Sequence, residues 1–298
     1  MMRVLITGAT GFLGSAIARA CVAAGIEVSA IRRSNSSLAR LDGIAERITF
    51  HNNTEVGIHD ALNCAGGCDS VIHAATCYGR QGEAWTTVLE SNLLFPLRIL
   101  EKALTIGVSQ FINIDTVLDS RINAYALSKR NFSDWGQLLL KTSELRFVNV
   151  RMEHLYGLGD DPSRFVTYII RQCLANAESV ELTRGEQIRD FIFIDDAVSG
   201  IMQLLISRES LPAGRSEIDL GNGNPVSIRQ LVERIHQLTK SRSYLCFGRI
   251  PYRENESMES KANISKLIEL GWNSRTSLDE GLAKTIAFEK IKLIVEAH

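Results

Sequence analysis

The chain has 298 residues, 45% hydrophobic and 22% charged, and its 33 basic and 34 acidic residues give a net charge of −1. This length allows one large domain or two of ordinary size, and the near-zero charge argues against binding to nucleic acid or an anionic membrane. No apolar run approaches the ~18–20 residues of a membrane span, and the apolar N-terminal segment is typical of a buried strand rather than of a signal peptide. We therefore expect a cytoplasmic globular protein.

Strand-like and helical segments alternate through the first half. The expected strands cover residues 3–7, 27–31, 48–51, 70–75, 111–115 and 145–151, and the expected helices cover 12–24, 58–64, 83–106 and 124–142. Strands such as 71–75 lack a polar face, as strands covered on both sides do. The pattern predicts an α/β fold with a Rossmann-type, doubly wound parallel sheet.

The alternation loosens after about residue 152. A loop is expected at 155–162, helices at 164–175, 195–207, 228–238 and 278–290, and a last strand at 216–220. We expect residues 1–155, with 189–222 returning to the sheet, to form the Rossmann domain. Residues 156–188 and 223–298 are expected to form a smaller, intertwined C-terminal lobe.

The cysteines show no metal-binding or disulfide pattern. No two of them have the C-x-x-C spacing, and Cys64 and Cys68 stand four residues apart, so a zinc site is not expected there. In a cytoplasmic protein they are expected to be free thiols. The full set is Cys21, Cys64, Cys68, Cys77, Cys173 and Cys246.

A glycine-rich turn joins the first strand to the first helix. A helix N-terminus offers free amides, and glycines let a pyrophosphate approach the backbone. A dinucleotide cofactor is therefore predicted here, with a tight structural turn as the alternative. The residues expected to bind it are Gly8, Thr10, Gly11, Phe12, Leu13 and Gly14.

A pair of residues further on has the spacing of a catalytic dyad. Tyr125 and Lys129 lie four residues apart, which places both side chains on one face of a helix. An ammonium beside a phenol favours the phenolate, so the pair can move a proton near neutral pH.

The G-x-x-G-x-x-G turn followed by Y-x-x-x-K resembles the short-chain dehydrogenase/reductase superfamily, and in particular its extended branch, the NAD-dependent epimerase/dehydratase family of nucleotide-sugar enzymes. The resemblance implies an oxidoreductase in which Thr116, at the end of a strand, polarises the substrate carbonyl. Ser120 is the alternative for that role. Dehydratases of this branch carry Asp-Glu directly after the threonine, but Val117 and Leu118 follow it here, which disfavours dehydration.

The second strand ends with Arg32, Arg33 and Ser34. An acidic residue there would bind the ribose hydroxyls of NAD, whereas arginines suit the 2′-phosphate of NADP. NADP(H) is therefore predicted, with a solvated basic strand end as the alternative. The first domain is accordingly expected to bind NADP, and the C-terminal lobe to bind substrate.

The resemblance covers nearly the whole chain and implies further site residues. Ala74, Ala75 and Asn92 are expected beside the cofactor. His154 replaces an asparagine that contacts substrate in the family, and Arg253 is either a phosphate ligand or a solvated residue. His73 is expected to be a core histidine. The expected substrate-binding residues are Thr76, Cys77, Tyr78, Arg80, His154, Arg189 and Arg253.

Residues 76–80, 90–101, 153–157 and 171–174 show a closer resemblance to the reductases that make CDP-paratose or CDP-abequose. It implies NADPH-dependent reduction of the C4 ketone of CDP-4-keto-3,6-dideoxyglucose, in deoxysugar biosynthesis for O-antigen. A nucleotide-sugar 4-epimerase with retained NAD is the alternative. A regulatory protein that binds NADP(H) without turnover is disfavoured, because such proteins lose the Tyr/Lys pair. A homodimer through the helices around residues 90–105 and 125–140 is also implied.

Overall fold

The computed structural model describes residues 1–63, 67–140 and 143–296, so Cys64 and the expected helix end at Thr142 lie outside the described residues. The chain divides into two compact units. Unit 1 comprises Met1–Met152, Val198–Asp219 and Ser265–Trp272. Unit 2 comprises Glu153–Ala197, Leu220–Ile264 and the chain from Asn273 onward.

The two largest differences from the expected bounds lie in the second half of the chain. The return to unit 1 begins at Val198 rather than at residue 189, because the two short strands between Ile188 and Phe193 pair with other strands of unit 2. Ser265–Trp272 belongs to unit 1, where the indole of Trp272 donates a hydrogen bond to Ser199 Oγ at 2.8 Å.

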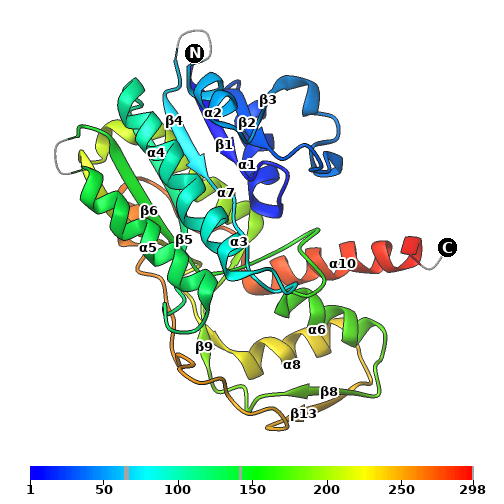
Figure 1. Ribbon diagram of the computed structural model, residues 1–298. Coiled ribbons are helices and arrows are strands. Elements are labelled where there is room, and N and C mark those ends of the chain that lie inside the picture. The colour runs from blue at the N-terminus through cyan, green and yellow to red at the C-terminus, as the bar shows by residue number, and fades with distance from the viewer. Residues whose placement is uncertain (64–66, 141–142, 297–298) are drawn as a thin grey trace. The chain divides into compact units, whose positions relative to one another are not determined.

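Unit 1 is built on a seven-stranded sheet with the order β11-β6-β5-β4-β1-β2-β3 (Figure 1). The paired strands run parallel, and β11 is parallel to β6 because hydrogen bonds join Gly214 to Leu145 at one end and Leu220 to Glu153 at the other. The predicted doubly wound α/β fold is therefore confirmed. The strands are β1 (Arg3–Thr7), β2 (Glu27–Arg32), β3 (Ile48–Asn52), β4 (Ser70–His73), β5 (Gln110–Thr116), β6 (Arg146–Met152) and β11 (Gly214–Leu220).

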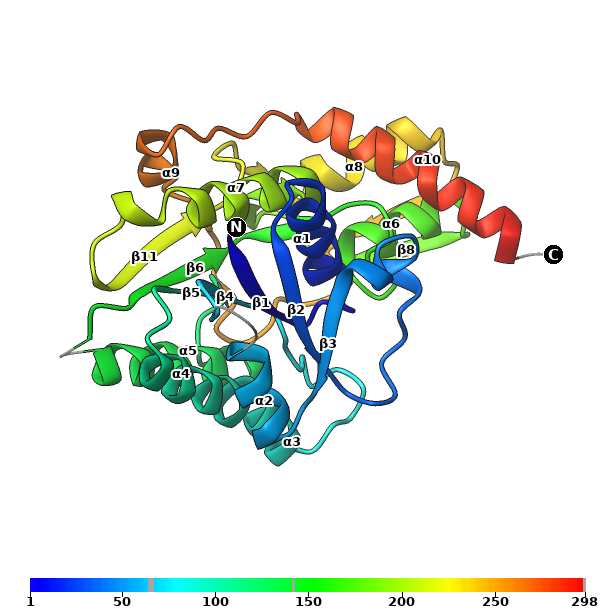
Figure 2. The ribbon, with the colours of Figure 1, turned by 90° about the horizontal axis from the view of Figure 1, so that it is seen from above.

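Helices cover both faces of this sheet. Figure 2 shows α2 (Glu55–Leu62), α4 (Phe95–Ile106) and α5 (Ala124–Leu139) on one face, and α1 (Phe12–Ala23) and α7 (Ile194–Ile206) on the other. Apolar side chains of α2, α4 and α5, among them Ile58, Ile99 and Phe132, pack on Val71 and Phe111 of the sheet in one buried cluster. Smaller elements of unit 1 are α3 (Trp85–Leu89), α9 (Ser265–Glu269), η1 (Ala39–Leu41), η2 (Ala45–Arg47) and η5 (Arg208–Ser210).

Two helices of unit 1 begin elsewhere than expected. The helix expected over 83–106 begins at Trp85 and contains a π-helical segment, η3 (Glu90–Leu94), before α4. Such π segments often occur at functional sites. The helix expected from residue 58 begins at Glu55, because Thr54 Oγ1 accepts a hydrogen bond from the Gly57 amide and caps the first turn.

Unit 2 combines α6 (Phe165–Leu174), α8 (Ile228–Thr239) and α10 (Leu278–Glu296) with three strand pairs. These are β7 (His154–Tyr156) with β10 (Phe191–Phe193), β9 (Ile188–Arg189) with β12 (Val226–Ser227), and β8 (Ser179–Leu182) with β13 (Tyr244–Phe247). The expectation of a loop from residue 155 is wrong at its start, where β7 lies. A three-residue strand has no periodicity of its own and forms only because a partner distant in sequence pairs with it.

The helices, the metal-ligating side chains and the cysteines of the described residues can be characterised further. Among the helices of residues 1–63, 67–140 and 143–296, none is long and apolar enough to cross a membrane. In the same ranges, no cluster of three or more His, Cys, Asp or Glu side chains could hold a metal ion. Cys21, Cys68, Cys77, Cys173 and Cys246 are free thiols.

Candidate active site

The glycine turn after β1 has no room for side chains. Gly8 has a φ of +71°, and a Cβ on it would lie 2.6 Å from the amide nitrogen of Ala75. The close approach is fixed by Thr7 Oγ1, which accepts a hydrogen bond from that amide at 3.2 Å. Ala74 and Ala75 therefore lie directly against the turn, and their contact with a cofactor stays a prediction.

The N-terminus of α1 is suited to a diphosphate. In this fully described helix, no side chain caps the first turn and no acidic residue lies in it. The unused amides and the positive end of the helix dipole therefore face outward from Gly11. Together with the absence of Cβ atoms at Gly8 and Gly14, this arrangement fits the pyrophosphate of a dinucleotide.

We expect Gly14→Ala to weaken both the fold and cofactor binding. A Cβ at Gly14 would lie 2.1 Å from the carbonyl oxygen of Gly8, whereas one at Gly11 would lie 3.2 Å from the same oxygen. Overpacking of this kind costs ~1–3 kcal/mol. Thermal melts should therefore show a clearly larger loss for Gly14→Ala than for the matched Gly11→Ala. Equal melting temperatures for the two variants would contradict the close packing of the turn.

The two arginines at the end of β2 lie in different surroundings. Arg32 is partly buried, and its guanidinium carbon lies 5.1 Å from the centroid of the Phe50 ring. Arg33 is exposed. Burial raises the pKa of the Cys77 thiol, and the charge of Arg33 opposes that rise, so Arg33 acts on the loop after β4. Ser34 is also exposed. Arg33 is thus the better placed of the two to meet an anion at this edge of the sheet.

Asn92, in the π segment η3, ties the loop after β4 to the start of α5. It is fully buried. Its Oδ1 accepts hydrogen bonds from the Thr76 hydroxyl at 3.2 Å and the Cys77 amide at 2.7 Å. Its Nδ2 donates to Cys77 O at 2.8 Å and to Ser128 Oγ at 3.0 Å. Its side chain therefore holds the loop after β4 to α5, and its expected place beside the cofactor stays a prediction.

The loop held in this way places Tyr78 against Tyr125. Their ring centroids are 4.8 Å apart, at an interplanar angle of 42°. The guanidinium carbon of Arg80 lies 5.2 Å from the Tyr78 ring centroid. A stack of this kind is worth ~0.5–1 kcal/mol at an exposed site. Tyr78 is thus brought beside the predicted catalytic tyrosine, and Arg80 lies against Tyr78.

The predicted catalytic residues gather at the carboxyl end of β5 and the first turns of α5. Thr116 is the last residue of β5, and its hydroxyl accepts a hydrogen bond from the Leu118 amide at 3.2 Å. Asn123 Oδ1 caps α5 by accepting from the Ala126 amide at 2.8 Å, so the helix begins one residue before Tyr125. Parallel sheets bind ligands at this edge.

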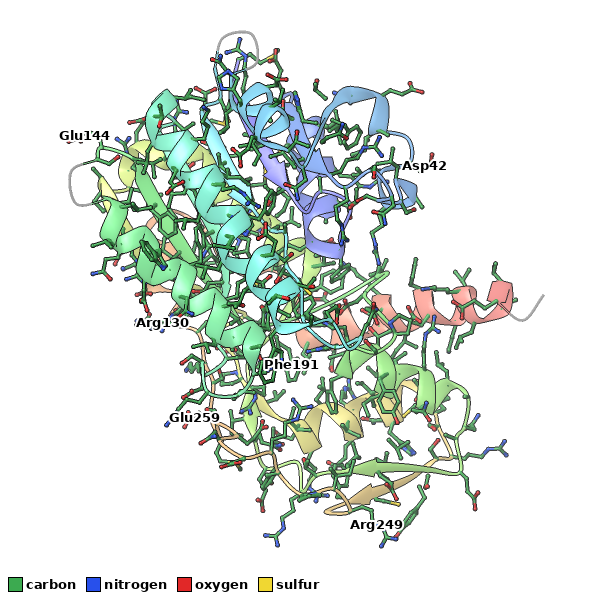
Figure 3. All side chains as sticks on the ribbon, viewed as in Figure 1. Asp42, Arg130, Glu144, Phe191, Arg249 and Glu259 are labelled. Carbon is green, nitrogen blue, oxygen red and sulfur yellow. The ribbon has the colours of Figure 1, made fainter. Side chains whose placement is uncertain are left out.

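Lys129 is buried, with 2% of its surface exposed. Burial lowers the pKa of its ammonium to about 8, and the negative charge of Asp115 opposes that fall. Arg130, the next residue, lies on the outer surface of α5, where it pairs with Asp134 (Figure 3). The contrast shows that the inward position of Lys129 follows from its place on the helix rather than from a locally basic sequence.

The structure adds polar residues that the sequence analysis did not single out. Ser128 Oγ donates to Tyr125 O at 2.9 Å and accepts from Asn92. Asp115, directly before Thr116, accepts hydrogen bonds from the Thr116 amide and from Asn149 Nδ2, each at 2.8 Å. Neither has a sequence signal of its own, because each depends on which strands and helices lie side by side. His73 is fully buried and bonded to Thr7, as expected of a core histidine.

The residues expected to bind substrate in unit 2 differ in their burial and in their contacts with other residues. Arg189 is 5% exposed, donates to Ile188 O at 2.8 Å and pairs with Glu256. His154 is half-buried, with its Nδ1 3.3 Å from Glu153 Oε2 and its ring 5.6 Å from that of Phe191, which is labelled in Figure 3. Arg253 is exposed. An anion that reached Arg189 would therefore have to displace the Glu256 carboxylate.

Comparison with known proteins agrees with this arrangement. Residues 4–221 match the model of the NAD dependent epimerase/dehydratase family. The chain is 31% identical to the CDP-abequose synthase of Salmonella typhimurium, over 95% of this chain and 97% of that protein. It is 28% identical to the CDP-abequose synthase of Salmonella muenchen, over 97% and 98%.

A solved structure shows the same fold. It is the UDP-glucuronic acid 4-epimerase of Bacillus cereus in complex with UDP-glucuronic acid and NAD, with a TM-score of 0.85 and 20% identity over 98% of this chain and all of that one. The family match, the glycine turn and the Tyr125/Lys129 pair agree: the chain is an enzyme that belongs to the NAD-dependent epimerase/dehydratase family, within the extended short-chain dehydrogenases/reductases.

Proposed function

We propose that the enzyme uses NADPH to reduce the C4 ketone of a nucleotide-linked deoxysugar, CDP-4-keto-3,6-dideoxy-D-glucose, to CDP-paratose or CDP-abequose. The observation that carries the proposal is the similarity to two CDP-abequose synthases over nearly the full length of all three chains. The sequence similarity at Thr76–Arg80 and around His154 supports the choice of a 3-deoxy sugar.

The cofactor part of the proposal rests on β2. The family is described as NAD-dependent, but an acidic residue that would bind the ribose hydroxyls of NAD is replaced by Arg32 and Arg33 at the end of this strand. The exposed guanidinium of Arg33 suits a 2′-phosphate. NADPH, when bound, supplies the hydride.

The chain's own residues then supply the proton and the orientation. We assign Tyr125 as the acid that gives its hydroxyl proton to the ketone oxygen, and Thr116 as the hydroxyl that polarises the same oxygen. Lys129 holds the cofactor ribose and favours the tyrosinate that remains. Such acid catalysis contributes ~10²–10⁴-fold to a rate. Tyr78, stacked on Tyr125, is placed to shape the sugar site.

A substrate panel with NADPH oxidation as the readout tests the proposal. We expect NADPH to be consumed with CDP-4-keto-3,6-dideoxyglucose, and little or none with UDP-glucose or UDP-galactose. A 3-hydroxy analogue of the ketone belongs in the panel, because the 3-deoxy preference rests on sequence similarity alone. Failure of every 4-keto sugar to consume NADPH would contradict the proposal.

The second candidate is a nucleotide-sugar 4-epimerase with retained NAD. It is favoured by the close structural similarity to a 4-epimerase that was solved with NAD. Interconversion of UDP-glucose and UDP-galactose without added cofactor would support this function instead of ketone reduction.

Arg33→Asp should change the cofactor preference. A charge-assisted hydrogen bond is worth ~1.5–3 kcal/mol, so the preference for NADPH over NADH should fall ~10- to 100-fold. Fluorescence titration of both cofactors measures it, with Arg249→Asp as a control, because Arg249 is an exposed arginine of unit 2 that pairs with Glu181. An unchanged ratio in Arg33→Asp would mean that Arg33 does not contact the 2′-phosphate.

The resemblance implies a homodimer through the helices around residues 90–105 and 125–140. We also propose this homodimer, and we extend its interface to the exposed apolar side of α3, which directly precedes residue 90. Leu127, Trp135 and Leu138 of α5 and Trp85 of α3 are exposed, and the two helices pack together. Exposed apolar groups clustered in this way mark interfaces. The double substitution Trp135→Glu/Leu138→Glu should give a folded monomer in sedimentation velocity. Ile206→Glu, on α7 across the sheet, should leave a dimer; a dimeric double variant would contradict the proposed interface.

A further inference from the structure

A row of polar side chains crosses the middle of the unit 1 sheet. The strand register pairs Thr7 with His73, His73 with Asn113, and Asn113 with Asn149. Each of the four is at most 1% exposed. A buried polar group costs free energy unless it is hydrogen-bonded. The other positions of the sheet are largely apolar. Packing alone therefore does not explain four adjacent buried polar side chains, which indicates that they have a further role.

The row ends in a carboxylate that is held in one orientation. Asp115 lies two residues beyond Asn113 on β5, so both point to the same face of the sheet. Asp115 Oδ2 accepts from Asn149 Nδ2 and Oδ1 accepts from the Thr116 amide, each at 2.8 Å. Asn149 is fixed in turn, because its Oδ1 accepts from Asn113 Nδ2 at 2.7 Å. Asn113 and Asn149 thus orient the Asp115 carboxylate.

This carboxylate acts on Lys129. Helix α5 packs on β5, and the charge of Asp115 raises the pKa that burial lowers to about 8. From β4, His73 faces the same ammonium, but burial and the charge of Lys129 hold the pKa of His73 well below its ordinary value. His73 is therefore uncharged near neutral pH. Tyr125 lies four residues before Lys129 on the same face of α5.

We propose that Asp115 is a positioning residue that keeps the buried Lys129 protonated at neutral pH, and that Asn149 fixes the carboxylate for this purpose. The inference rests on the proposed catalytic role of Lys129. With a pKa of about 8, Lys129 is ~90% protonated at pH 7. Loss of an opposite charge is expected to lower this pKa by ~1 or more. At pH 7, half or less of the Lys129 side chains would then be protonated.

The titration of Lys129 in the full chain tests this directly. Lysines labelled with ¹³C at Cε are followed by NMR from pH 6 to 11, and the Lys129 signal is assigned by its loss in Lys129→Met. We expect Asp115→Asn to lower the Lys129 pKa by ~1 or more. Asp134→Asn, which removes the exposed carboxylate paired with Arg130 on the same helix, should leave it unchanged. Asp115→Ser keeps an acceptor for Asn149 and provides a second variant, with the same shift expected.

The pH dependence of NADPH binding provides a second readout. In the wild type, affinity should fall as pH rises through about 8, and in Asp115→Asn the same fall should occur ~1 pH unit lower, with recovery near pH 6. A folded Asp115 variant with the wild-type Lys129 pKa would overturn the inference. A chain that reduces no 4-keto sugar but shows the Lys129 shift would instead overturn only the proposed function.

Discussion

Replacing Tyr125 with phenylalanine should lower the turnover number at least ~100-fold and leave the affinity for NADPH nearly unchanged. Phenylalanine keeps the ring, and hence the 4.8 Å contact with Tyr78, but it has no hydroxyl to protonate the ketone oxygen. The loss should therefore appear in kcat rather than in cofactor binding. Steady-state kinetics and fluorescence titration measure the two effects separately.

Tyr244→Phe is the matched control, because Tyr244 is a tyrosine of unit 2 with 72% of its surface exposed. It should leave kcat and cofactor affinity as they are. Near wild-type turnover in Tyr125→Phe would contradict the assignment of the proton donor.

Lys129→Met should damage both kcat and NADPH affinity, because the ammonium is assigned to the ribose as well as to Tyr125. We expect kcat to fall at least ~100-fold. The dissociation constant of NADPH should rise ~10-fold or more, since a hydrogen bond to a charged group is worth ~1.5–3 kcal/mol. Wild-type cofactor affinity in this variant would contradict the contact of Lys129 with the ribose.

The same variant should fold at least as stably as the wild type. The folded-state pKa of Lys129, about 8, lies below the ordinary lysine value of 10.5, so the fold disfavours the charged form. A shift of one pKa unit corresponds to ~1.4 kcal/mol, so burying the charged Lys129 costs on the order of 3 kcal/mol of folding free energy. This cost is fully present below pH 8, where Lys129 is protonated in both the folded and the unfolded chain. It disappears as pH rises from 8 to 10.5. The stability advantage of Lys129→Met in urea melts should shrink over that range.

The parts of the site with local signals could be predicted from the sequence. The glycine turn combines residues that need no Cβ with a strand before it and a helix after it. The spacing of Tyr125 and Lys129 places them on one helix face whatever the rest of the fold does. The apolar strands likewise predicted the parallel sheet, because strands covered on both faces have no polar side.

The row of buried polar side chains across the sheet could not be predicted in the same way. Asn113 and Asn149 meet only because β5 and β6 pair in one register, and a shift of one residue would turn one of them to the other face. Asp115 had no signal of its own for the same reason. In unit 2, the Glu256 partner of Arg189 lies 67 residues away in the chain, so no local pattern in the sequence indicated this ion pair.

Transfer of deuterium from NADPH labelled at nicotinamide C4 tests the central proposal most directly. With CDP-4-keto-3,6-dideoxyglucose as substrate, we expect one deuterium at C4 of the sugar, seen as a gain of one mass unit and the loss of the H4 signal in the proton NMR spectrum. The two C4-deuterated epimers of NADPH, used in turn, would also identify the face of hydride delivery. Unlabelled reduced product from both epimers, or a C4 epimer formed without consumption of NADPH, would contradict the assignment as an NADPH-dependent 4-ketoreductase.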